Sequence, residues 1–62
     1  MATRLLRMRQ VLEMVGLSKS QVYRMMQQAK FPLPIQVSER CKRWLLEDVE
    51  SWQNERIAEN RK

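Results

Sequence analysis

The 62-residue sequence contains no histidine, one cysteine and one glycine, and these shortages exclude several kinds of site. Cys41 has no second cysteine to pair with, so an internal disulfide is excluded, and a Cys/His zinc site lacks its ligands. A glycine-rich phosphate loop cannot be built around Gly16 alone, and the serines near it have no histidine to act as a base. We therefore expect no metal, no cofactor, no small-molecule substrate and no enzymatic activity.

Long apolar runs are also missing. No segment approaches the roughly 18 residues that cross a membrane, and residues 1–10 lack the apolar core of a signal peptide. We expect a cytoplasmic protein without membrane contact. A chain of 62 residues makes one domain at most, here residues 1–62, and we expect residues 60–62 to be frayed.

Positive charge is in excess and is unevenly placed. Twelve Lys and Arg against seven Asp and Glu give a net charge of +5 and a pI near 10.2. Residues 1–44 carry nine basic and two acidic side chains, whereas residues 45–62 carry three and five. A basic surface on the first two thirds of the chain favours a polyanionic partner, most simply nucleic acid.

The strongest local pattern is a pair of amphipathic runs on either side of Gly16. Gly16 suits the left-handed position that ends a helix. Ser18, followed three residues later by Gln21, forms a capping box and marks the start of a second helix. We predict helices over residues 9–15 and 19–29, arranged as a helix-turn-helix.

Prolines and the alternation of apolar and polar residues further along the chain predict a hairpin and a third helix. Pro32 and Pro34 prevent the second helix from continuing, and alternation of apolar and polar residues follows them. This element order makes the fold class mainly α with a small β-hairpin, a winged helix-turn-helix. The expected elements are an extended segment at 4–8, strands at 35–37 and 41–44 around a tip at 38–40, and a helix at 47–59.

The same periodicity predicts which side chains form the core. Stacking of the two tryptophans on single-stranded nucleic acid is an alternative, but both have apolar neighbours that favour packing. The side chains expected to face the core are Leu6, Met8, Val22, Met25, Met26, Ala29, Trp44, Leu46, Val49, Trp52 and Ile57.

The second helix also carries a polar face that contains no carboxylate. Arginine can pair with guanine and glutamine with adenine in the major groove, whereas phosphates repel an acidic residue. An ordinary solvated helix face is the alternative. The candidates are Ser20, Arg24, Gln27 and Gln28 for base contact, with Lys19 and Tyr23 for contact with the DNA backbone.

The predicted hairpin holds three positive charges, at Arg40, Lys42 and Arg43. In a regular strand Arg40 and Lys42 share one face, and Arg43 shares the other with Cys41. We expect Arg40 and Lys42 to contact the DNA backbone as a wing. A charged edge strand that resists aggregation is the alternative.

A protein-interaction module without DNA binding is the competing function, because the acidic third helix offers a docking face while the basic face keeps the domain soluble. The salt dependence of binding distinguishes the two functions. For DNA binding, the logarithm of the affinity falls with the logarithm of the salt concentration, with a slope of about −0.9 for each phosphate contacted.

Over nearly its whole length the sequence resembles the AlpA family of small phage and prophage regulators. The resemblance implies a winged-helix fold like that of MerR-type DNA-binding domains and regulation of mobile-element genes, often those for an integrase. Related proteins are excisionases, which bend attachment-site DNA and steer an integrase toward excision, so this is the alternative function. The matching residues are Arg4-Leu5-Leu6-Arg7, Val11-Leu12, Gly16 to Ser20, Val22-Tyr23-Arg24, Phe31-Pro32, Arg43-Trp44 and Asp48 to Trp52.

The resemblance assigns the recognition helix to Lys19, Ser20, Tyr23 and Arg24, and the wing to Arg40. Two positions depart from the family pattern. Family members usually have glycines at the hairpin tip, where this chain has Ser38 and Glu39, and phosphate repels Glu39. Many also have glycine near position 29, and because Ala29 resists a left-handed conformation we expect the second helix to end differently.

The sequence therefore predicts a prophage regulator that binds double-stranded DNA in a sequence-specific way. One small domain makes a limited interface, so we expect several copies to bind repeated sites.

Overall fold

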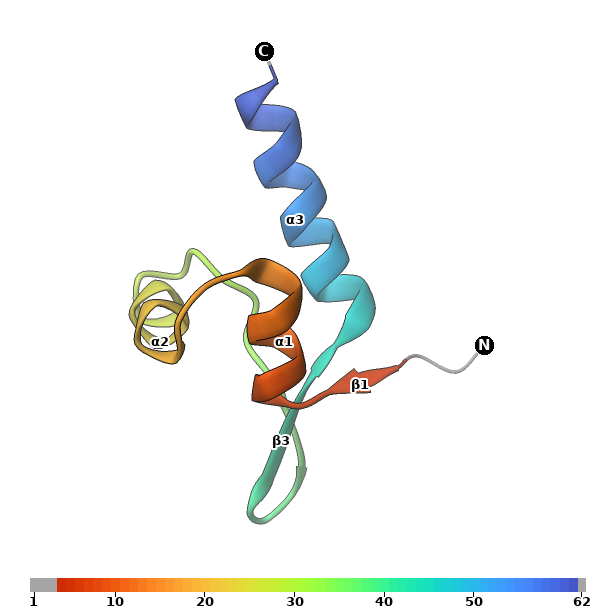
Figure 1. Ribbon diagram of the computed structural model, residues 1–62. Coiled ribbons are helices and arrows are strands. Elements are labelled where there is room, and N and C mark those ends of the chain that lie inside the picture. The colour runs from red at the N-terminus through yellow and green to blue at the C-terminus, as the bar shows by residue number, and fades with distance from the viewer. Residues whose placement is uncertain (1–3, 62) are drawn as a thin grey trace.

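The computed structural model describes residues 4–61, and these residues form three helices and a three-stranded antiparallel sheet. The predicted winged helix-turn-helix is confirmed. In Figure 1 the β2–β3 hairpin projects from one end of the molecule and the C-terminal part of α3 projects from the other. The elements are β1 (Leu5–Leu6), α1 (Met8–Val15), α2 (Lys19–Gln27), β2 (Ile35–Ser38), β3 (Cys41–Leu45) and α3 (Leu46–Asn60).

The turn between α1 and α2 has the predicted geometry at both helix ends. Gly16 ends α1 in the left-handed region at φ 70°, and its N–H donates to the Leu12 carbonyl. At the start of α2 the Ser18 hydroxyl accepts from the Gln21 N–H at 3.2 Å, while the Gln21 side-chain oxygen accepts from the Ser18 N–H at 2.9 Å. These bonds satisfy backbone groups that a helix end leaves free and set the direction of α2.

The C-terminal end of α2 contradicts the expectation drawn from Ala29. The helix ends at Gln27, and Ala29 adopts φ 57°, the left-handed conformation that it was expected to resist. Its N–H donates to the Met26 carbonyl at 3.1 Å, and the Lys30 N–H donates to the Met25 carbonyl at 2.8 Å. This is the Schellman pattern, which satisfies two terminal carbonyls. Ala29 is exposed, so its expected place in the core is also wrong.

The extended segment predicted over residues 4–8 is confirmed at Leu5–Leu6, which join the sheet as β1, but Met8 already belongs to α1. β1 pairs antiparallel with β3, with Leu5 opposite Leu45 and Leu6 opposite Trp44. The strand order is β1-β3-β2, so β3 is the central strand. One face of the sheet thereby carries Leu6 and Trp44 toward the helices.

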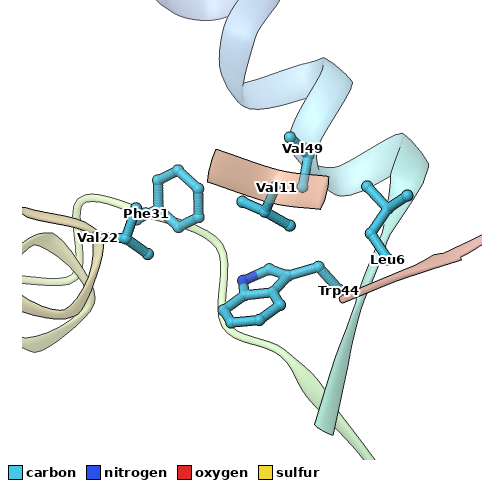
Figure 2. Close-up of a cluster of buried hydrophobic side chains, with 6 residues drawn as sticks. All are labelled: Leu6, Val11, Val22, Phe31, Trp44 and Val49. Carbon is cyan, nitrogen blue, oxygen red and sulfur yellow. The ribbon is translucent and has the colours of Figure 1, made fainter. Parts of the chain in front are cut away.

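Six side chains from different parts of the chain form the buried core (Figure 2). Partly buried residues surround them, including Met8, Met25, Met26, Leu46 and Trp52, which confirms most of the predicted core. Ile57 is an exception, because half of its surface is exposed. The core residues are Leu6, Val11, Val22, Phe31, Trp44 and Val49.

The third helix is slightly longer than the sequence predicted. Glu47 and Asp48 lie in its first turn, where the helix dipole favours negative charge. Asn60 was expected to be frayed but is the last residue of α3, and its side-chain amide donates to the Arg56 carbonyl at 2.8 Å. Of the other two residues expected to be frayed, Arg61 follows the helix and residue 62 lies outside the described residues.

The strained conformation at Ala29 yields a stability prediction. Ala29→Gly should raise the free energy of unfolding by about 1 kcal/mol. The substitution removes the left-handed penalty of about 1–2 kcal/mol. Part of this gain is lost because glycine adds backbone entropy to the unfolded chain. Gly16→Ala is the matched control: a Cβ there has open space around it, so the strained φ alone should make this variant less stable. Urea unfolding followed by circular dichroism measures both. A loss of stability in Ala29→Gly would contradict the left-handed conformation of Ala29.

Candidate nucleic-acid interface

The polar face of α2 is exposed as the sequence predicted. Val22 on the opposite side is fully buried, and this anchors the helix so that Ser20, Arg24 and Gln27 face solvent. No Asp or Glu lies in α2. The face therefore offers hydrogen-bond donors and acceptors without a charge that would repel phosphate.

The remaining predicted residues of α2 lie at its two ends and on its side. Lys19 is the first helical residue and Gln28 follows the last, with its N–H directed at the carbonyls of Arg24 and Met25. Both side chains are exposed. Tyr23 is 47% exposed on the flank that faces the hairpin, so its hydroxyl is accessible to a ligand.

A cleft of about 180 Å³ separates α2 from the hairpin and brings two predicted backbone-contact residues together. Tyr23 enters it from α2 and Lys42 from β3. Lys42 and Trp44 are two residues apart on β3 and both line the cleft, so they share the strand face directed at α2. The residues lining the cleft are Met8, Tyr23, Met26, Pro34, Lys42 and Trp44.

The hairpin tip closes without glycine. Pairing between β2 and β3 is irregular at Val37, the extra residue of a bulge, and Glu39 and Arg40 form the turn. Within residues 4–61, Ala29 is the only non-glycine residue at positive φ, so the tip does not use a turn that needs a left-handed residue. The Gln36 side-chain amide donates to the Glu39 carbonyl at 3.2 Å and braces the turn.

The two arginines of the hairpin are placed differently. Arg40 is exposed in the turn before β3 begins, so the alternation that was expected to align it with Lys42 does not extend to it. Arg43 lies opposite Ile35 on the other face of the sheet, as predicted, and its guanidinium donates to the Lys42 carbonyl at 2.9 Å. Arg40 and Lys42 thus remain the exposed cations nearest to the tip and the cleft.

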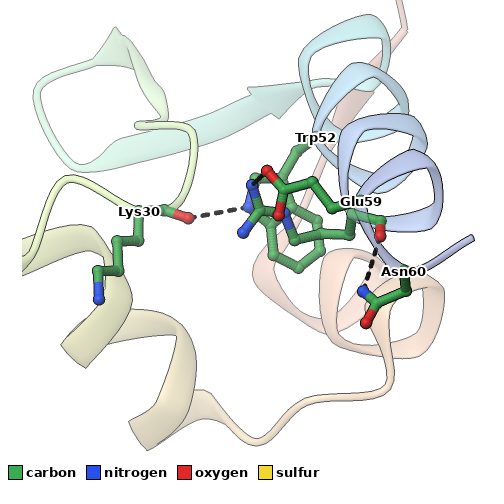
Figure 3. A network of polar contacts seen from close by, with 5 residues as sticks. Lys30, Trp52, Glu59 and Asn60 are labelled. Atoms are coloured by element: carbon green, nitrogen blue, oxygen red, sulfur yellow. Dashed lines mark hydrogen bonds and ion pairs between the residues drawn. The ribbon is translucent and has the colours of Figure 1, made fainter. Parts of the chain in front are cut away.

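The position of α2 relative to the hairpin depends on two indole hydrogen bonds that the sequence reasoning missed. Trp44 donates from its N–H to the Pro32 carbonyl at 2.9 Å, and Trp52 donates to the Lys30 carbonyl at 2.8 Å (Figure 3 shows the latter). The Trp52 ring also meets Phe31 edge to face, with 4.9 Å between ring centroids. A buried indole N–H needs an acceptor, and a segment with two prolines has carbonyls outside regular structure, so this signal was available in the sequence.

Residues 4–61 contain no cluster of three or more potential metal ligands, and no helix among them is long and apolar enough to span a membrane. Five of the seven acidic side chains lie on α3, while the exposed residues of α2 and the hairpin include Lys19, Arg24, Arg40 and Lys42. The basic and acidic parts of the sequence are therefore also separated in the fold.

A scan against protein-family models finds a match over residues 4–57 to the family of the prophage CP4-57 regulatory protein AlpA. The chain belongs to the AlpA family. Comparisons with curated proteins and with solved structures gave no match. The match covers every helix and strand except the end of α3, so the family assignment extends over both α2 and the hairpin, and AlpA proteins are prophage regulators.

The two indole bonds predict a graded loss of stability in this AlpA family member. Trp44→Phe should lower the free energy of unfolding by about 1–3 kcal/mol, since it leaves the Pro32 carbonyl without its partner in a partly buried place. Trp52→Phe keeps the ring contact with Phe31 and removes a more exposed bond, so its loss should be smaller. Urea unfolding followed by circular dichroism gives both values. A larger loss for Trp52→Phe would contradict this ranking.

Proposed function

We propose that this AlpA family protein regulates prophage genes by binding double-stranded DNA in a sequence-specific way, with α2 in the major groove and the β2–β3 hairpin as a wing on the backbone. The observation that carries the proposal is the exposed, carboxylate-free face of α2, held beside a cleft that contains Tyr23 and Lys42. A helix fits the major groove, and phosphates on either side attract the flanking cations.

The residues divide into two roles. Side chains on the face of α2 have the reach and the donor pattern to contact base edges, whereas those at its start, in the cleft and at the hairpin tip meet phosphates. Binding needs no cofactor and no chemical step. The proposed base contacts are Ser20, Arg24, Gln27 and Gln28, and the proposed backbone contacts are Lys19, Tyr23, Arg40 and Lys42.

The experiment that tests the proposal selects bound sequences from a pool of 20-bp duplexes with random centres and then measures affinity by fluorescence anisotropy at several salt concentrations. DNA binding predicts an enriched sequence and an affinity that falls steeply with salt. Failure to enrich any sequence, together with no measurable binding to the random pool, would overturn the proposal.

Arg24→Ala tests the role of α2 in reading sequence. The variant should bind the selected duplex about 1–3 kcal/mol more weakly and should lose preference at one base pair, because a bidentate contact contributes this much to discrimination. Arg40→Ala is the matched control at the wing. It should weaken selected and random duplexes alike and reduce the salt slope by about 1. Equal losses on both duplexes for Arg24→Ala would assign Arg24 to phosphate instead.

Glu39→Gln tests whether the hairpin tip lies near the DNA backbone. The Glu39 side chain is exposed, and the bond that braces the turn uses its backbone carbonyl, so the substitution leaves the turn intact. Removal of a negative charge close to phosphate should tighten binding to both selected and random duplexes, with a gain that shrinks as salt rises. Glu13→Gln, on the exposed side of α1, removes the same charge as a control. Equal effects of the two variants would place the tip away from DNA.

A further inference from the structure

Within residues 4–61, the sheet face that points away from the helices carries exposed apolar side chains. Leu5 is 40% exposed and Ile35 is 42% exposed, although both are large aliphatic side chains. Strand register places Leu5 beside Leu45 and Ile35 beside Arg43, so one cation lies among apolar groups. Exposed apolar patches on small domains mark binding surfaces. We call this surface, made of Leu5, Ile35, Cys41, Arg43 and Leu45, the sheet face.

A second surface has the opposite character. An open groove of about 470 Å³ runs between α3 and residues 29–32. Phe31, Pro32 and Trp52 supply aromatic and apolar lining, while Asp48 and Glu55 lie two helical turns apart on the same side of α3 with Ser51 between them. We call this surface the α3 groove.

The two basic residues in the lining of the α3 groove do not neutralise these carboxylates. The Arg56 guanidinium lies near the Trp52 ring and pairs with Glu59 at 2.9 Å, and the Lys30 side chain points away from Trp52 in Figure 3. Among residues 4–61, neither Asp48 nor Glu55 has an ion-pair partner. The groove therefore offers unpaired negative charge beside an aromatic surface.

The two surfaces complement each other and share no residue. Contact of the sheet face with itself would bring two Arg43 side chains into one interface without a carboxylate, and contact of the groove with itself would bring four carboxylates together, both of which are unfavourable. We propose that the sheet face of one copy docks in the α3 groove of the next, so that copies assemble head to tail along DNA. Such a heterologous contact leaves one surface free at each end and can repeat. The inference rests on the proposed function.

The contact is small, which determines where it can form. The sheet face offers five side chains, whereas a stable interface of standard size uses roughly 20–30 residues on each partner. Copies should therefore remain separate in solution at micromolar concentration. Neighbouring sites on DNA raise the effective concentration into the millimolar range, where a weak contact becomes populated.

Cooperativity on paired sites tests the contact. A set of duplexes carries two copies of the selected sequence, and the distance between the two site centres varies over one helical turn of DNA. The affinity of the protein for each of these duplexes is compared with its affinity for a duplex with one site. At one spacing the second molecule should bind between about 5-fold and 150-fold more tightly, the usual range of coupling between sites. Glu55→Lys should remove this gain and keep single-site affinity, whereas Glu50→Lys, on the side of α3 away from the groove, should retain the gain.

A charge exchange then identifies the partner surfaces. Arg43→Glu combined with Glu55→Lys in the same chain should restore the cooperativity that Glu55→Lys removes. Lack of restoration, or cooperativity that survives Glu55→Lys, would overturn the head-to-tail contact. If single-site binding is intact and no spacing gives cooperativity, this inference fails while DNA binding stands; if single-site binding is absent, the proposed function fails as well.

Disulfide capture distinguishes head-to-tail from symmetric contact. Ser51→Cys places a thiol in the groove, and the sheet face proposed to dock there carries the native Cys41 of the neighbouring copy. Mild oxidation with diamide on the paired-site duplex should produce a disulfide-linked dimer, and duplexes with more sites should produce a ladder. Ser51→Cys with Cys41→Ser should produce neither. A disulfide dimer of the unaltered chain through Cys41 alone would indicate a symmetric sheet contact and overturn the proposal.

Discussion

The arrangement of α2 relative to the hairpin depends on the two indole N–H bonds to the segment that joins them. Trp44 comes from the central strand and Trp52 from α3, and both donate to carbonyls within residues 30–32. Val22 is the only fully buried residue of α2, and Met25 and Met26 are partly buried against the core, so packing holds one side of this helix without fixing its direction. Its orientation is therefore set at its two ends, by the turn at Gly16 and by the indole-bound segment.

These bonds also explain why a helix can end on an alanine in the left-handed region. A left-handed alanine costs about 1–2 kcal/mol, but the chain must reverse there to bury Phe31 and bring the Lys30 carbonyl to Trp52. Two backbone hydrogen bonds and an aromatic contact offset that cost. Tertiary contacts thus override a local preference at Ala29.

Features with local causes were predictable from the sequence, and features with distant causes were not. The capping box at Ser18, the left-handed Gly16 and the hairpin all depend on residues within a few positions of one another, and all were predicted. The pairing of β1 with β3 was missed because it joins distant parts of the chain. Periodicity placed Ile57 on the apolar side of α3, but it gives no information about where the core ends. The exposure of Arg24 followed from the helical period, whereas the shared cleft of Tyr23 and Lys42 required the tertiary structure.

Under the proposed function, the distribution of charge assigns sequence reading and sequence-independent attraction to different parts of the domain. α2 carries few charges on its exposed face, so its contribution to nonspecific affinity is small and its hydrogen-bonding groups can discriminate between bases. In the proposed complex, cations at the wing supply attraction to DNA that does not depend on sequence, and the negative charge of Glu39 reduces this attraction at the hairpin tip. Acidic α3 projects away from the hairpin (Figure 1), where it adds no attraction to the backbone and is free to contact protein. In the proposed head-to-tail assembly, affinity gained from a neighbouring copy adds to specificity, because both copies must find their sites.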